Sequence, residues 1–499
     1  MATVVLTTFE LRAVESRYAT APHSLMARAG RSIAEAARRM ASGAGARVIV
    51  VVGPGNNGGD AWVAAAHLLE SGQDTVVLDT AGVAPTAPEA RAAFEVVRAR
   101  TGAVTREWPP GAAPALVVDG LLGIGLARDV QAPLDAVIAK MNACGAPILA
   151  VDVPSGIESS TGRARGAAVR ATRTLTFIAH KVGLHTADGL DHCGVVELDD
   201  LGTGPATREV AKGMLVTPAD AMPWLTPRVR NAHKGHFGTL GIVGGARGMV
   251  GAALLAGRAG LLAGAGKVRV GLLTPESPLV DLHTPEMMLA SVDDAMASDV
   301  LVVGPGAGQS PSATSVSMFE RTVLPGAIAS TKPLVLDADA LNTLAYNEPL
   351  RTAASKRNAP TLLTPHPAEA ARLLGRETAD VQADRLAAAL ELARRLDALV
   401  VLKGAGSICA GPDGKWSINT TGNPGLASGG TGDVLAGVLG ALLAQRLDPW
   451  RALQYAVCLH GAAADTLVAR GKGPVGLTAS EIALECRRLL NLWTAKNQG

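Results

Sequence analysis

The chain has 499 residues, more than one ordinary domain of ~100–200 residues, so we expect two or three domains with a core each. Its 46 Lys and Arg residues nearly balance 44 Asp and Glu residues, giving a formal net charge of +2. This balance excludes a strongly basic nucleic-acid binder and a polyacidic tail. Apolar residues make up 48% and aromatic residues only 3%, which excludes bulk disorder and indicates a core of small aliphatic side chains.

Membrane insertion and disulfide bonding are not expected. The longest uncharged apolar stretch, Val434–Gln445, is shorter than the ~20 residues that a bilayer-spanning helix needs. The first residues, MATVVLTTFELR, lack the basic and apolar regions of a secretory signal. The 5 cysteines are odd in number and form no CxxC pair, which disfavours structural disulfides and a thiolate zinc site. We therefore predict a cytoplasmic protein.

Short Val/Ile/Leu runs alternate with Ala-rich helical stretches along the whole chain, which predicts an α/β fold with largely parallel sheets. In the first half we expect strands at Val48–Val52, Thr75–Leu78, Leu116–Val118 and Ile148–Val151. In the second half we expect strands at Thr239–Val243, Val268–Gly271, Val300–Val303, Pro333–Leu336, Thr361–Leu363 and Leu399–Leu402. Between the halves, residues 199–220 are polar and broken by Gly and Pro. This segment predicts domains 1–212 and 213–499.

The first dense motif, GPGNNGGD, follows the strand at Val48–Val52 and precedes a helix expected at Ala61–Glu70. Gly53, Gly55 and Gly58 satisfy GxGxxG, and Asp79 ends the next strand, as in a dinucleotide fingerprint. A plain tight turn in a parallel sheet explains the same glycines equally well.

The polar residues around this turn argue against a bound pyrophosphate. A carboxylate such as Asp60 sits badly beside phosphate, and together with Asn56 and Asn57 it suits a hydroxylated ligand or a hard cation held by oxygens. Asp119 and Asp152 end two further strands. One such Asp is usually a turn or helix cap, but the carboxyl ends of parallel strands converge where ligands bind. We therefore expect a site at this edge.

GPGNNGGD, DGLLGIGL and DVPSG, in this order, resemble the YjeF N-terminal domain, the NAD(P)H-hydrate epimerase. The resemblance implies a Rossmann-like three-layer domain with a potassium ion held by Asn57, Asp119 and Ser155. It departs from the usual pattern at Ala61, where Gly is usual, and at Ile124, where Thr is common. It also implies the following contacts to the hydrate: Asn56, Asn57, Gly58, Gly59, Asp60, Gly123, Ile124, Gly125, Leu126, Ala127, Arg128, Asp129 and Asp152.

The implied reaction is consistent with these residue types. A hydrated nicotinamide ring carries a hydroxyl on a carbon beside the ring nitrogen, and inversion there needs a group that accepts and returns a proton. Asp152 is our candidate acid/base. Potassium has too low a charge density for strong Lewis-acid chemistry, so we expect it to fix the loops.

In the second half, the strongest motif is GGTGD at 429–433, which opens a long apolar helix with Asp433 in its first turn. Free N–H groups at such a helix end bind phosphate, and Lys403 in LKGAGS is placed to meet phosphate charge. Asp433 could instead only cap the helix. No Walker A motif is present.

The GGTGD helix resembles the ribokinase-like fold, and with HKGHFGTLGIVGG, TPHPAE and KGAGS the half resembles the ADP-dependent NAD(P)H-hydrate dehydratase. The resemblance implies a ribokinase-like α/β domain that uses ADP, with magnesium, as co-substrate. Implied ADP contacts are Lys403, Gly404, Ala405, Gly406, Ser407 and Gly432; implied hydrate contacts are Ala252, Gly306, His366 and Asp433. Asp433 is the candidate base that removes the substrate hydroxyl proton while phosphate is transferred to it.

Several alternatives stay open. His366 could only fill a turn, and Asp337 and Asp339 could hold magnesium or cap a helix. The chain as a whole could be a ribokinase-type kinase for a small hydroxymethyl compound. Its first half could be a binding module without activity or, less consistently with Asp60 and the asparagine pair, a NAD dehydrogenase. We expect small-molecule substrates (hydrated NADH and NADPH), no nucleic-acid or membrane partner, and a homo-oligomer.

Overall fold

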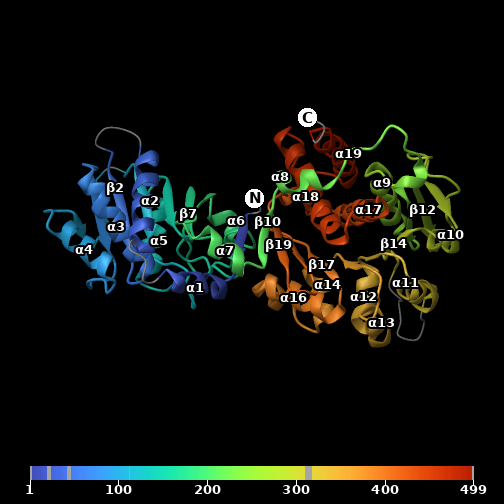
Figure 1. The fold of residues 1–499 in the computed structure, drawn as a ribbon, viewed down its shortest axis with the longest axis horizontal. Coiled ribbons are helices and arrows are strands. Elements are labelled where there is room, and N and C mark those ends of the chain that lie inside the picture. Colours follow the sequence, from blue (N-terminus) through green and yellow to red (C-terminus); the bar gives the residue numbers. More distant parts are fainter. Residues whose placement is uncertain (1–2, 19–23, 42–45, 112, 309–316, 497–499) are drawn as a thin grey trace. The chain divides into compact units, whose positions relative to one another are not determined.

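The structure is a computed structural model that describes residues 3–18, 24–41, 46–111, 113–308 and 317–496. These residues form two compact units, Thr3–Gly213 and the chain from Met214 onward (Figure 1). Within the described residues, no helix combines the length and the apolar character that crossing a bilayer requires.

The N-terminal unit is built on a parallel seven-stranded sheet in the order β4-β3-β2-β5-β6-β7-β9. Its strands are β2 (Val48–Val52), β3 (Thr75–Asp79), β4 (Val104–Thr105), β5 (Leu116–Gly120), β6 (Ile148–Val151), β7 (Arg173–Phe177) and β9 (Val195–Asp199). Strands β1 (Val4–Leu6) and β8 (His180–Lys181) pair in parallel and are not part of this seven-stranded sheet. The helices are α1 (Thr8–Arg17), α2 (Leu25–Met40), α3 (Asn56–Glu70), α4 (Pro88–Arg98), α5 (Leu134–Ala143), η1 (Val182–Leu184), α6 (Gly189–His192) and α7 (Gly204–Val210).

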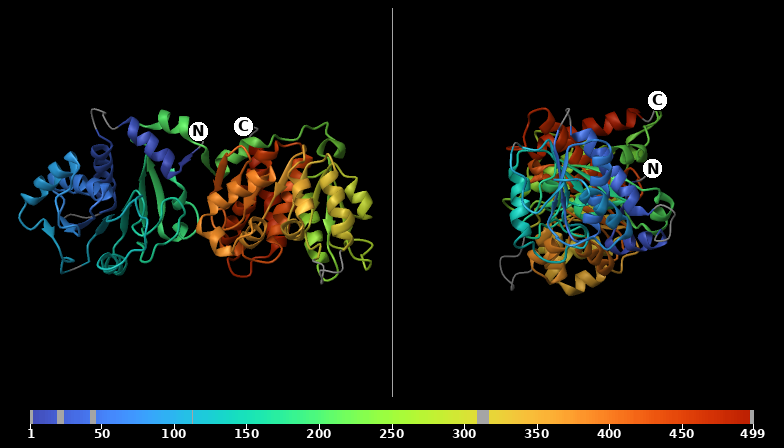
Figure 2. Two further views of the ribbon diagram at one scale, coloured as in Figure 1. Left: turned by 90° about the horizontal axis from the view of Figure 1, so that it is seen from below. Right: turned by 90° about the vertical axis from the view of Figure 1, so that its left-hand side faces the viewer.

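Strand β2, with the sequence VIVVV, shows why this sheet has helices on both faces. All five of its residues are buried, and β-branched side chains suit a strand covered on both sides. Val48, Val50 and Val52 pack in the cluster that contains α2 and α3. Ile49 and Val51 pack with α5 on the opposite face. The unit is therefore a three-layer α/β structure (Figure 2).

The C-terminal unit contains a longer sheet, in which β13-β12-β11-β14-β15-β16-β17 run parallel. Strands β18 and β19 extend it antiparallel, and β10 follows β19. The strands are β10 (Gly213–Val216), β11 (Thr239–Gly244), β12 (Lys267–Leu272), β13 (Met288–Ala290), β14 (Val300–Val303), β15 (Leu334–Leu336), β16 (Thr361–Leu363), β17 (Leu399–Leu402), β18 (Ile408–Ala410) and β19 (Trp416–Asn419). The helical segments are α8 (Pro218–Ala221), η2 (Met222–Trp224), η3 (Lys234–Phe237), α9 (Val250–Leu262), α10 (Val292–Met296), η4 (Phe319–Val323), α11 (Leu324–Ala329), α12 (Asp339–Tyr346), α13 (Glu348–Ala354), α14 (Pro367–Leu374), α15 (Thr378–Ala383), α16 (Arg385–Leu396), η5 (Pro424–Leu426), α17 (Thr431–Ala444), α18 (Pro449–Ala469) and α19 (Ala479–Lys496).

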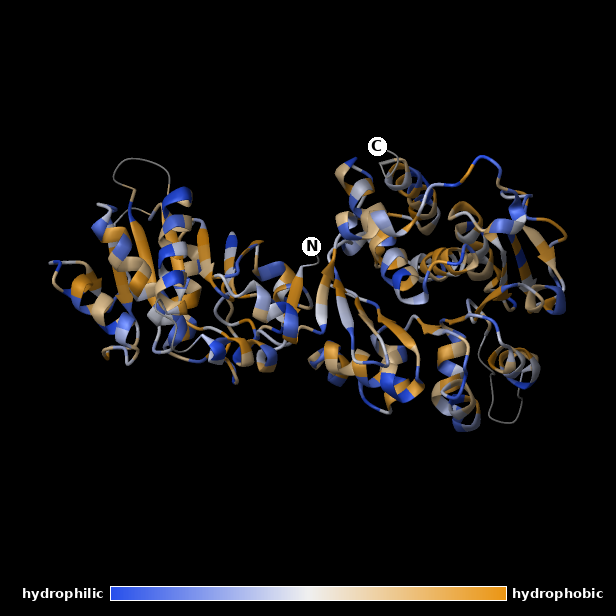
Figure 3. Cartoon of the chain, viewed as in Figure 1, coloured by the Kyte–Doolittle hydropathy of each residue, from blue (hydrophilic) through white to orange (hydrophobic). Residues whose placement is uncertain are grey.

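Helices also cover both faces of this sheet. Helices α9, α17, α18 and α19 lie on one face, where they form the largest apolar cluster, and α12, α14 and α16 lie on the other (Figure 1). The strands of both sheets are coloured predominantly as hydrophobic in Figure 3. Close packing of α9 on α17 depends on glycine, because a Cβ at Gly437 would lie 2.0 Å from the Ala256 carbonyl oxygen.

The predicted α/β class with parallel sheets is confirmed, and every strand predicted in the two halves is present to within a residue or two at its ends. Three expectations were wrong in detail. Helix α3 begins at Asn56, not at Ala61, so the NNGG segment is helical instead of a loop. Strands β7, β9, β18 and β19 were not predicted, and residues 199–220 contain α7 and β10.

The early start of α3 has a steric reason. A Cβ at Gly58 would lie 1.9 Å from the Gly53 carbonyl oxygen, so this glycine lets the first helical turn press directly against the strand end. A glycine-rich segment looks like a loop because glycine disfavours helices, but here close approach of the backbone outweighs propensity.

We predict that Gly437→Ala lowers the free energy of unfolding of the C-terminal unit by about 1–3 kcal/mol, because the added methyl meets rigid backbone. Gly251→Ala in α9 is the matched control, since a Cβ there meets nothing within 4 Å and alanine favours helix over glycine by ~0.5–1 kcal/mol. Denaturant unfolding followed by circular dichroism measures both. Equal effects of the two variants would contradict the packing argument.

Candidate active sites

The carboxyl edge of the N-terminal sheet brings three of the predicted residues together. The Ser155 hydroxyl lies 2.6 Å from Asp119 Oδ1, and the Ser155 backbone N–H donates to Asp119 Oδ2 at 2.8 Å. The Asn57 amide donates to the Leu122 carbonyl at 2.8 Å, and the Leu122 N–H donates to the Ser155 hydroxyl at 2.7 Å. The loop after β5 thus links all three predicted potassium ligands.

Asp119 is a buried carboxylate with an incomplete charge balance. Its side chain is fully buried, and in the described part of the chain it receives hydrogen bonds from Ser155 and Leu121 but forms no salt bridge. Burial raises the pKa of Asp119 to about 6, although the hydrogen bonds from Ser155 and Leu121 act in the opposite direction. A nearby cation would favour its charged form.

Asp152 occupies a conformation that is uncommon for a residue with a side chain. Its φ is +63°, in the left-handed region, and such strain in non-glycine residues is concentrated at functional sites. Asp152 Oδ1 forms an ion pair with Lys181 and accepts from the Thr176 hydroxyl at 3.2 Å and from the Phe177 N–H at 3.1 Å. One carboxylate oxygen is therefore firmly anchored.

Lys181 was not predicted as a site residue. Its side chain is 4% exposed, and its ammonium also donates to Thr176 Oγ1 at 2.8 Å and to the Phe177 carbonyl at 2.7 Å. Charged lysines are rarely buried without a partner. The Asp152 carboxylate is the charged partner that compensates Lys181 here. The sequence signal was present in the stretch TFIAHKVGL, where a lysine follows the apolar residues Phe177, Ile178 and Ala179.

Two further carboxylates interact with Asp152. Burial raises the pKa of Asp60 well above its usual value, and the charges of Asp152 and Glu15 add to this effect. Burial also raises the pKa of Glu15, with Asp152 as the next cause. Glu15, on α1, was not predicted. Asp60 and Glu15 therefore hold their protons more tightly than ordinary exposed acids do.

The other predicted epimerase residues divide into two groups. Asn56, Asn57, Gly58 and Gly59 form the first turn of α3, and Gly123 lies against Asn57, because a Cβ there would be 3.0 Å from Asn57 Cβ. The chain then moves outward, so that Gly125, Ala127, Arg128 and Asp129 are exposed while Ile124 and Leu126 are half-buried. Only the start of the 123–129 loop lies beside the buried cluster.

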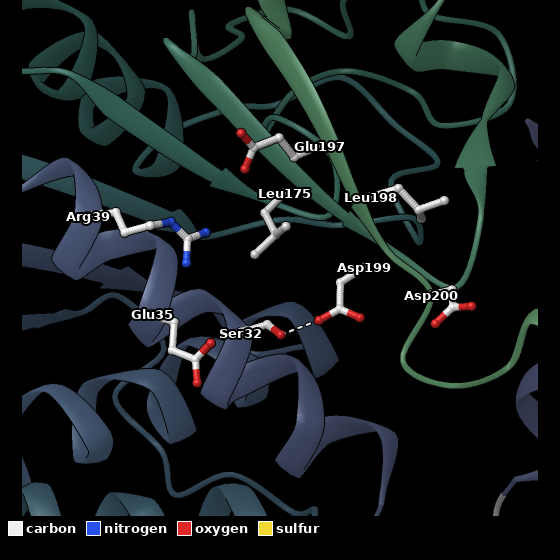
Figure 4. Close-up of a pocket in the computed structure, with 8 residues that line it drawn as sticks. All are labelled: Ser32, Glu35, Arg39, Leu175, Glu197, Leu198, Asp199 and Asp200. Atoms are coloured by element: carbon white, nitrogen blue, oxygen red, sulfur yellow. Dashed lines mark hydrogen bonds between the residues drawn. The ribbon is translucent and has the colours of Figure 1, made fainter.

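A cavity elsewhere in this unit is not the predicted site. Figure 4 shows a pocket of about 670 Å³ lined by Ser32, Glu35, Arg39, Leu175, Glu197, Leu198, Asp199 and Asp200. None of the predicted residues lines it. Its four carboxylates outnumber its one arginine, which disfavours a ligand that carries phosphates.

In the C-terminal unit, Lys403 lies at the end of β17 between buried acids. Its ammonium is 3.2 Å from Asp337 Oδ1 and 4.0 Å from Glu369 Oε2. Asp337 Oδ1 also accepts from the Thr364 hydroxyl at 2.6 Å. The acids follow β15 and β16, and β15, β16 and β17 are consecutive strands of the sheet, so neighbouring strand ends supply the cluster.

The predicted nucleotide loop is shaped by two glycines and closed by a serine. Gly404 and Gly406 have φ values of +139° and +62°, and the Ser407 hydroxyl donates to the Gly404 carbonyl at 3.1 Å. A Cβ at Gly404 would lie 2.6 Å from the guanidinium of Arg385. Arg385, which was not predicted, is 3% exposed, and burial lowers its pKa to about 10. The loop is therefore backed by a second cation.

The N-terminus of α17 faces Lys403. A Cβ at Gly432 would lie 3.2 Å from the Lys403 Nζ, so the two predicted nucleotide contacts are adjacent. Asp433 is the third residue of α17, and the N-cap residue Gly430 provides no side-chain hydrogen bond. Among the described residues Asp433 forms no capping hydrogen bond, which disfavours the interpretation that it only caps the helix.

Asp433 has the proton affinity that a base working near neutral pH requires. Burial raises its pKa to about 7, with further increases from the charges of Asp337, Asp339 and Glu369 and a decrease from Lys403. An acid poised near the working pH is the most effective proton acceptor.

The remaining predicted hydrate contacts lie beside this cluster. Gly306 packs on Ala252, because a Cβ at Gly306 would be 2.9 Å from Ala252 Cβ. In the same loop the Gly308 N–H donates to Asp339 Oδ2 at 2.8 Å. Asp339 thus supports the loop, and Asp337 is committed to Lys403. Magnesium binding by these two acids stays a prediction.

His366 is more than a turn residue. It is the N-cap of α14, where its Nδ1 accepts from the N–H groups of Ala368 at 3.1 Å and Glu369 at 3.4 Å. Burial lowers its pKa, and the charge of Lys403 contributes. The ring is therefore neutral at physiological pH and is held against the acidic cluster through Glu369, another residue that was not predicted.

Two family models match this chain. Residues 22–183 match the model described as YjeF-related protein N-terminus, and residues 240–487 match the model described as NAD(P)H-hydrate dehydratase. The two matches fall within the two compact units.

Relatives of known name match nearly the whole chain. The bifunctional NAD(P)H-hydrate repair enzyme Nnr of Escherichia coli is 38% identical over 481 residues, which cover 94% of this chain and 90% of that protein. The bifunctional NAD(P)H-hydrate repair enzyme of Leishmania major is 38% identical over 472 residues, which cover 87% of this chain and 83% of that protein. Among solved structures, the ADP/ATP-dependent NAD(P)H-hydrate dehydratase of Bacillus subtilis, co-crystallised with ATP/Mg²⁺, is 32% identical with a TM-score of 0.49, covering 56% of this chain and 98% of that one.

We predict that Asp337→Asn lowers the pKa of Asp433 below about 7, because Asp337 is the largest of the charges that raise it. Removing a neighbouring negative charge favours the ionised carboxylate. Asp339→Asn is the matched control and should lower the pKa less, since Asp339 contributes less. Carbon-13 NMR titration of aspartate-labelled protein measures the shifts, and an unchanged Asp433 in Asp337→Asn would contradict the proposed coupling.

Proposed function

This chain belongs to the family of bifunctional NAD(P)H-hydrate repair enzymes, and we propose that its two units divide the repair between them. Residues 1–212 would interconvert the R and S hydrates of NADH and NADPH, and residues 213–499 would dehydrate the S form with ADP, giving AMP and phosphate. The observation that carries the proposal is that each unit holds a strand-edge carboxylate cluster with a lysine inside it.

In the epimerase reaction, Asp152 would accept the proton of the substrate hydroxyl and later return it. Lys181 and the Phe177 N–H hold one of its oxygens, so the other oxygen is left to face the ligand. Asp60 and Glu15, which have raised pKa values, bind a proton more tightly than ordinary acids do and lie within electrostatic reach of Asp152. The first turn of α3 and the loop 123–129 would bind the rest of the hydrate.

A potassium ion in this unit is part of the proposal, and the residues present fit one. Asn57, Asp119 and Ser155 offer oxygen atoms from three strand ends that are joined by hydrogen bonds. Asp119 is a fully buried acid that lacks a basic partner among the described residues. A bound potassium ion would supply the missing positive charge and fix the loop geometry.

In the dehydratase reaction, Asp433 would take the hydroxyl proton while the substrate oxygen attacks the terminal phosphorus of ADP and AMP leaves. The phosphate would then leave the ring carbon as the ring nitrogen donates its electron pair, and loss of a proton from the next carbon restores the double bond. Lys403 and the N–H groups at the start of α17 would offset the charge of the phosphate in transfer. Ala252, Gly306 and His366 would hold the hydrate.

Magnesium would accompany the nucleotide. This ion is usually bound through substrate phosphates and only one or two carboxylates, so a cage made entirely of protein is not needed. The described residues contain no group of three or more His, Cys, Asp or Glu side chains arranged to hold a metal, which is compatible with that mode. A cytoplasmic homo-oligomer stays our prediction for location and assembly.

The central experiment incubates the purified chain with chemically hydrated NADH, with and without ADP, and follows absorbance at ~340 nm. We expect ADP-dependent recovery of NADH from both epimers. A ribokinase-type kinase would instead accumulate a phosphorylated product without recovery of absorbance, and that outcome would overturn the proposal.

Asp433→Asn should lower dehydration by at least about 100-fold, the lower range for loss of a general base, while ADP affinity and epimerisation remain. Asp152→Asn is the reciprocal variant and should abolish epimerisation while dehydration of the S hydrate continues. Chiral chromatography of the hydrates and calorimetric titration of ADP separate the activities. Near-normal dehydration in Asp433→Asn would remove it from the mechanism.

Asp119→Asn should raise the potassium concentration needed for epimerisation at least ~10-fold, because it removes the only charge in the proposed ligand set. Asp79→Asn is the matched control, since Asp79 ends the neighbouring strand β3 and its carboxylate accepts from the turn N–H groups of Ala81 and Gly82. Epimerase rates measured at constant ionic strength with potassium replaced by choline test both. A wild-type rate that ignores potassium would contradict the ion assignment.

A further inference from the structure

Glu369 is a buried acid for which the proposed reaction has so far no use. It is the third residue of α14 and 5% exposed. Its Oε2 accepts from the His366 backbone N–H at 2.8 Å, which completes a capping box in which His366 takes the N-cap position. A capping role alone is normally filled at the protein surface and needs no buried charge.

The same carboxylate contacts residues proposed for two different ligands. Its Oε1 lies 3.3 Å from Nε2 of His366, the proposed hydrate contact. Its Oε2 lies 4.0 Å from Nζ of Lys403, the proposed nucleotide contact. Glu369 therefore connects the proposed hydrate contact His366 with the proposed nucleotide contact Lys403.

The contacts of the His366 ring fix which nitrogen carries the proton. Nδ1 faces two backbone N–H donors, those of Ala368 and Glu369, so Nδ1 must present its lone pair. A neutral imidazole has one N–H, which is then on Nε2, the ring atom that lies 3.3 Å from Glu369 Oε1. Because the pKa of His366 is lowered by burial and by Lys403, the ring stays in this neutral form at pH 7.

We propose that Glu369 is a positioning residue that holds His366 as a neutral Nε2–H donor and aligns it with Lys403 for the dehydration step. The inference rests on the proposed function for the identity of the substrate. The tautomer of His366 and its cause follow from the structure alone. Nδ1 is occupied by the start of α14, so a substrate oxygen could meet the ring only at Nε2–H, which it would share with Glu369 Oε1.

The charge of Glu369 is only partly compensated within the cluster, because burial raises its pKa above the usual value. Lys403 and Arg372 act on it as positive charges and Asp337 as a negative one, and Asp433 is influenced by Glu369 in turn. Glu369 therefore acts on the histidine and, more weakly, on the proposed base.

Glu369→Gln tests the proposal with little change of shape. The glutamine oxygen can still accept the His366 backbone N–H, so α14 stays capped, but the amide cannot accept from Nε2–H while also facing Lys403. We expect kcat/KM for the hydrate to fall about 10- to 100-fold, the range for loss of a hydrogen bond to a charged group. ADP affinity should be unchanged or tighter, because Lys403 keeps Asp337 and loses a competing negative charge.

A second readout is independent of activity. Nitrogen-15 NMR of histidine-labelled chain, with His366→Asn identifying the signal, should show the Nε2–H tautomer at pH 7 to 8 in the wild type. Glu369→Gln should keep this tautomer, because backbone N–H groups fix it, but should shift the Nε2 resonance, because the group beside Nε2 loses its charge. Glu377→Gln is the matched control, since Glu377 takes part in the exposed capping box of α15, and it should change neither readout.

The outcomes are distinct. An Nδ1–H tautomer in the wild type overturns the inference whatever the activity, and so does a Glu369→Gln variant with wild-type hydrate kinetics. A parallel loss of ADP affinity and hydrate turnover would show a merely structural role and would also overturn it. If the wild type does not dehydrate the hydrate at all, the proposed function fails, while an Nε2 resonance that is unchanged in Glu369→Gln would still overturn the positioning role.

Discussion

The main constraint on this molecule is that ionisable acids are buried at the carboxyl ends of parallel strands. Such a charge cannot keep its water and must be compensated by a cation, by N–H donors or by a proton. The structure uses all three means: Lys181 compensates Asp152, Ser155 and Leu121 compensate Asp119 only in part, and Asp433 has a pKa of about 7. Buried acids whose negative charge is only partly compensated are the groups that can transfer a proton or bind a cation.

The two units reach similar clusters by different routes. In the N-terminal unit the lysine comes from the short strand β8, distant in sequence from the acid that it meets. In the C-terminal unit Lys403 directly follows β17, beside acids that follow β16, the adjacent strand, and β15, the strand beyond it. The first arrangement fixes one carboxylate by strained backbone and a lysine. The second shares one lysine among several acids, which keeps Asp433 sensitive to whatever binds Lys403.

The sequence predicted what depends on local pattern. Buried strands such as VIVVV, and the acids that end them, follow from side-chain type and the geometry of parallel sheets. It did not predict the start of α3, because the advantage of glycine at Gly58 lies in contact with Gly53 and not in local propensity. Lys181, Glu15 and Glu369 were missed for the same reason: their partners Asp152 and Lys403 lie on other elements, and a charged residue beside an apolar run normally predicts only a solvated end.

Coupling between Lys403 and Asp433 has a consequence for the order of events in the proposed reaction. Lys403 lowers the pKa of Asp433, whereas Asp337, Asp339 and Glu369 raise it. A nucleotide phosphate placed at Lys403 would add negative charge and withdraw the lysine's stabilisation from the carboxylate, so Asp433 would hold a proton more strongly once ADP is bound. A carboxylate that is ionised on entry and then gains proton affinity is a better acceptor for the substrate hydroxyl. The same electrostatics would couple the proton affinity of Asp433 to the charge at Lys403, which makes proton removal most favourable when a phosphate is present to be transferred.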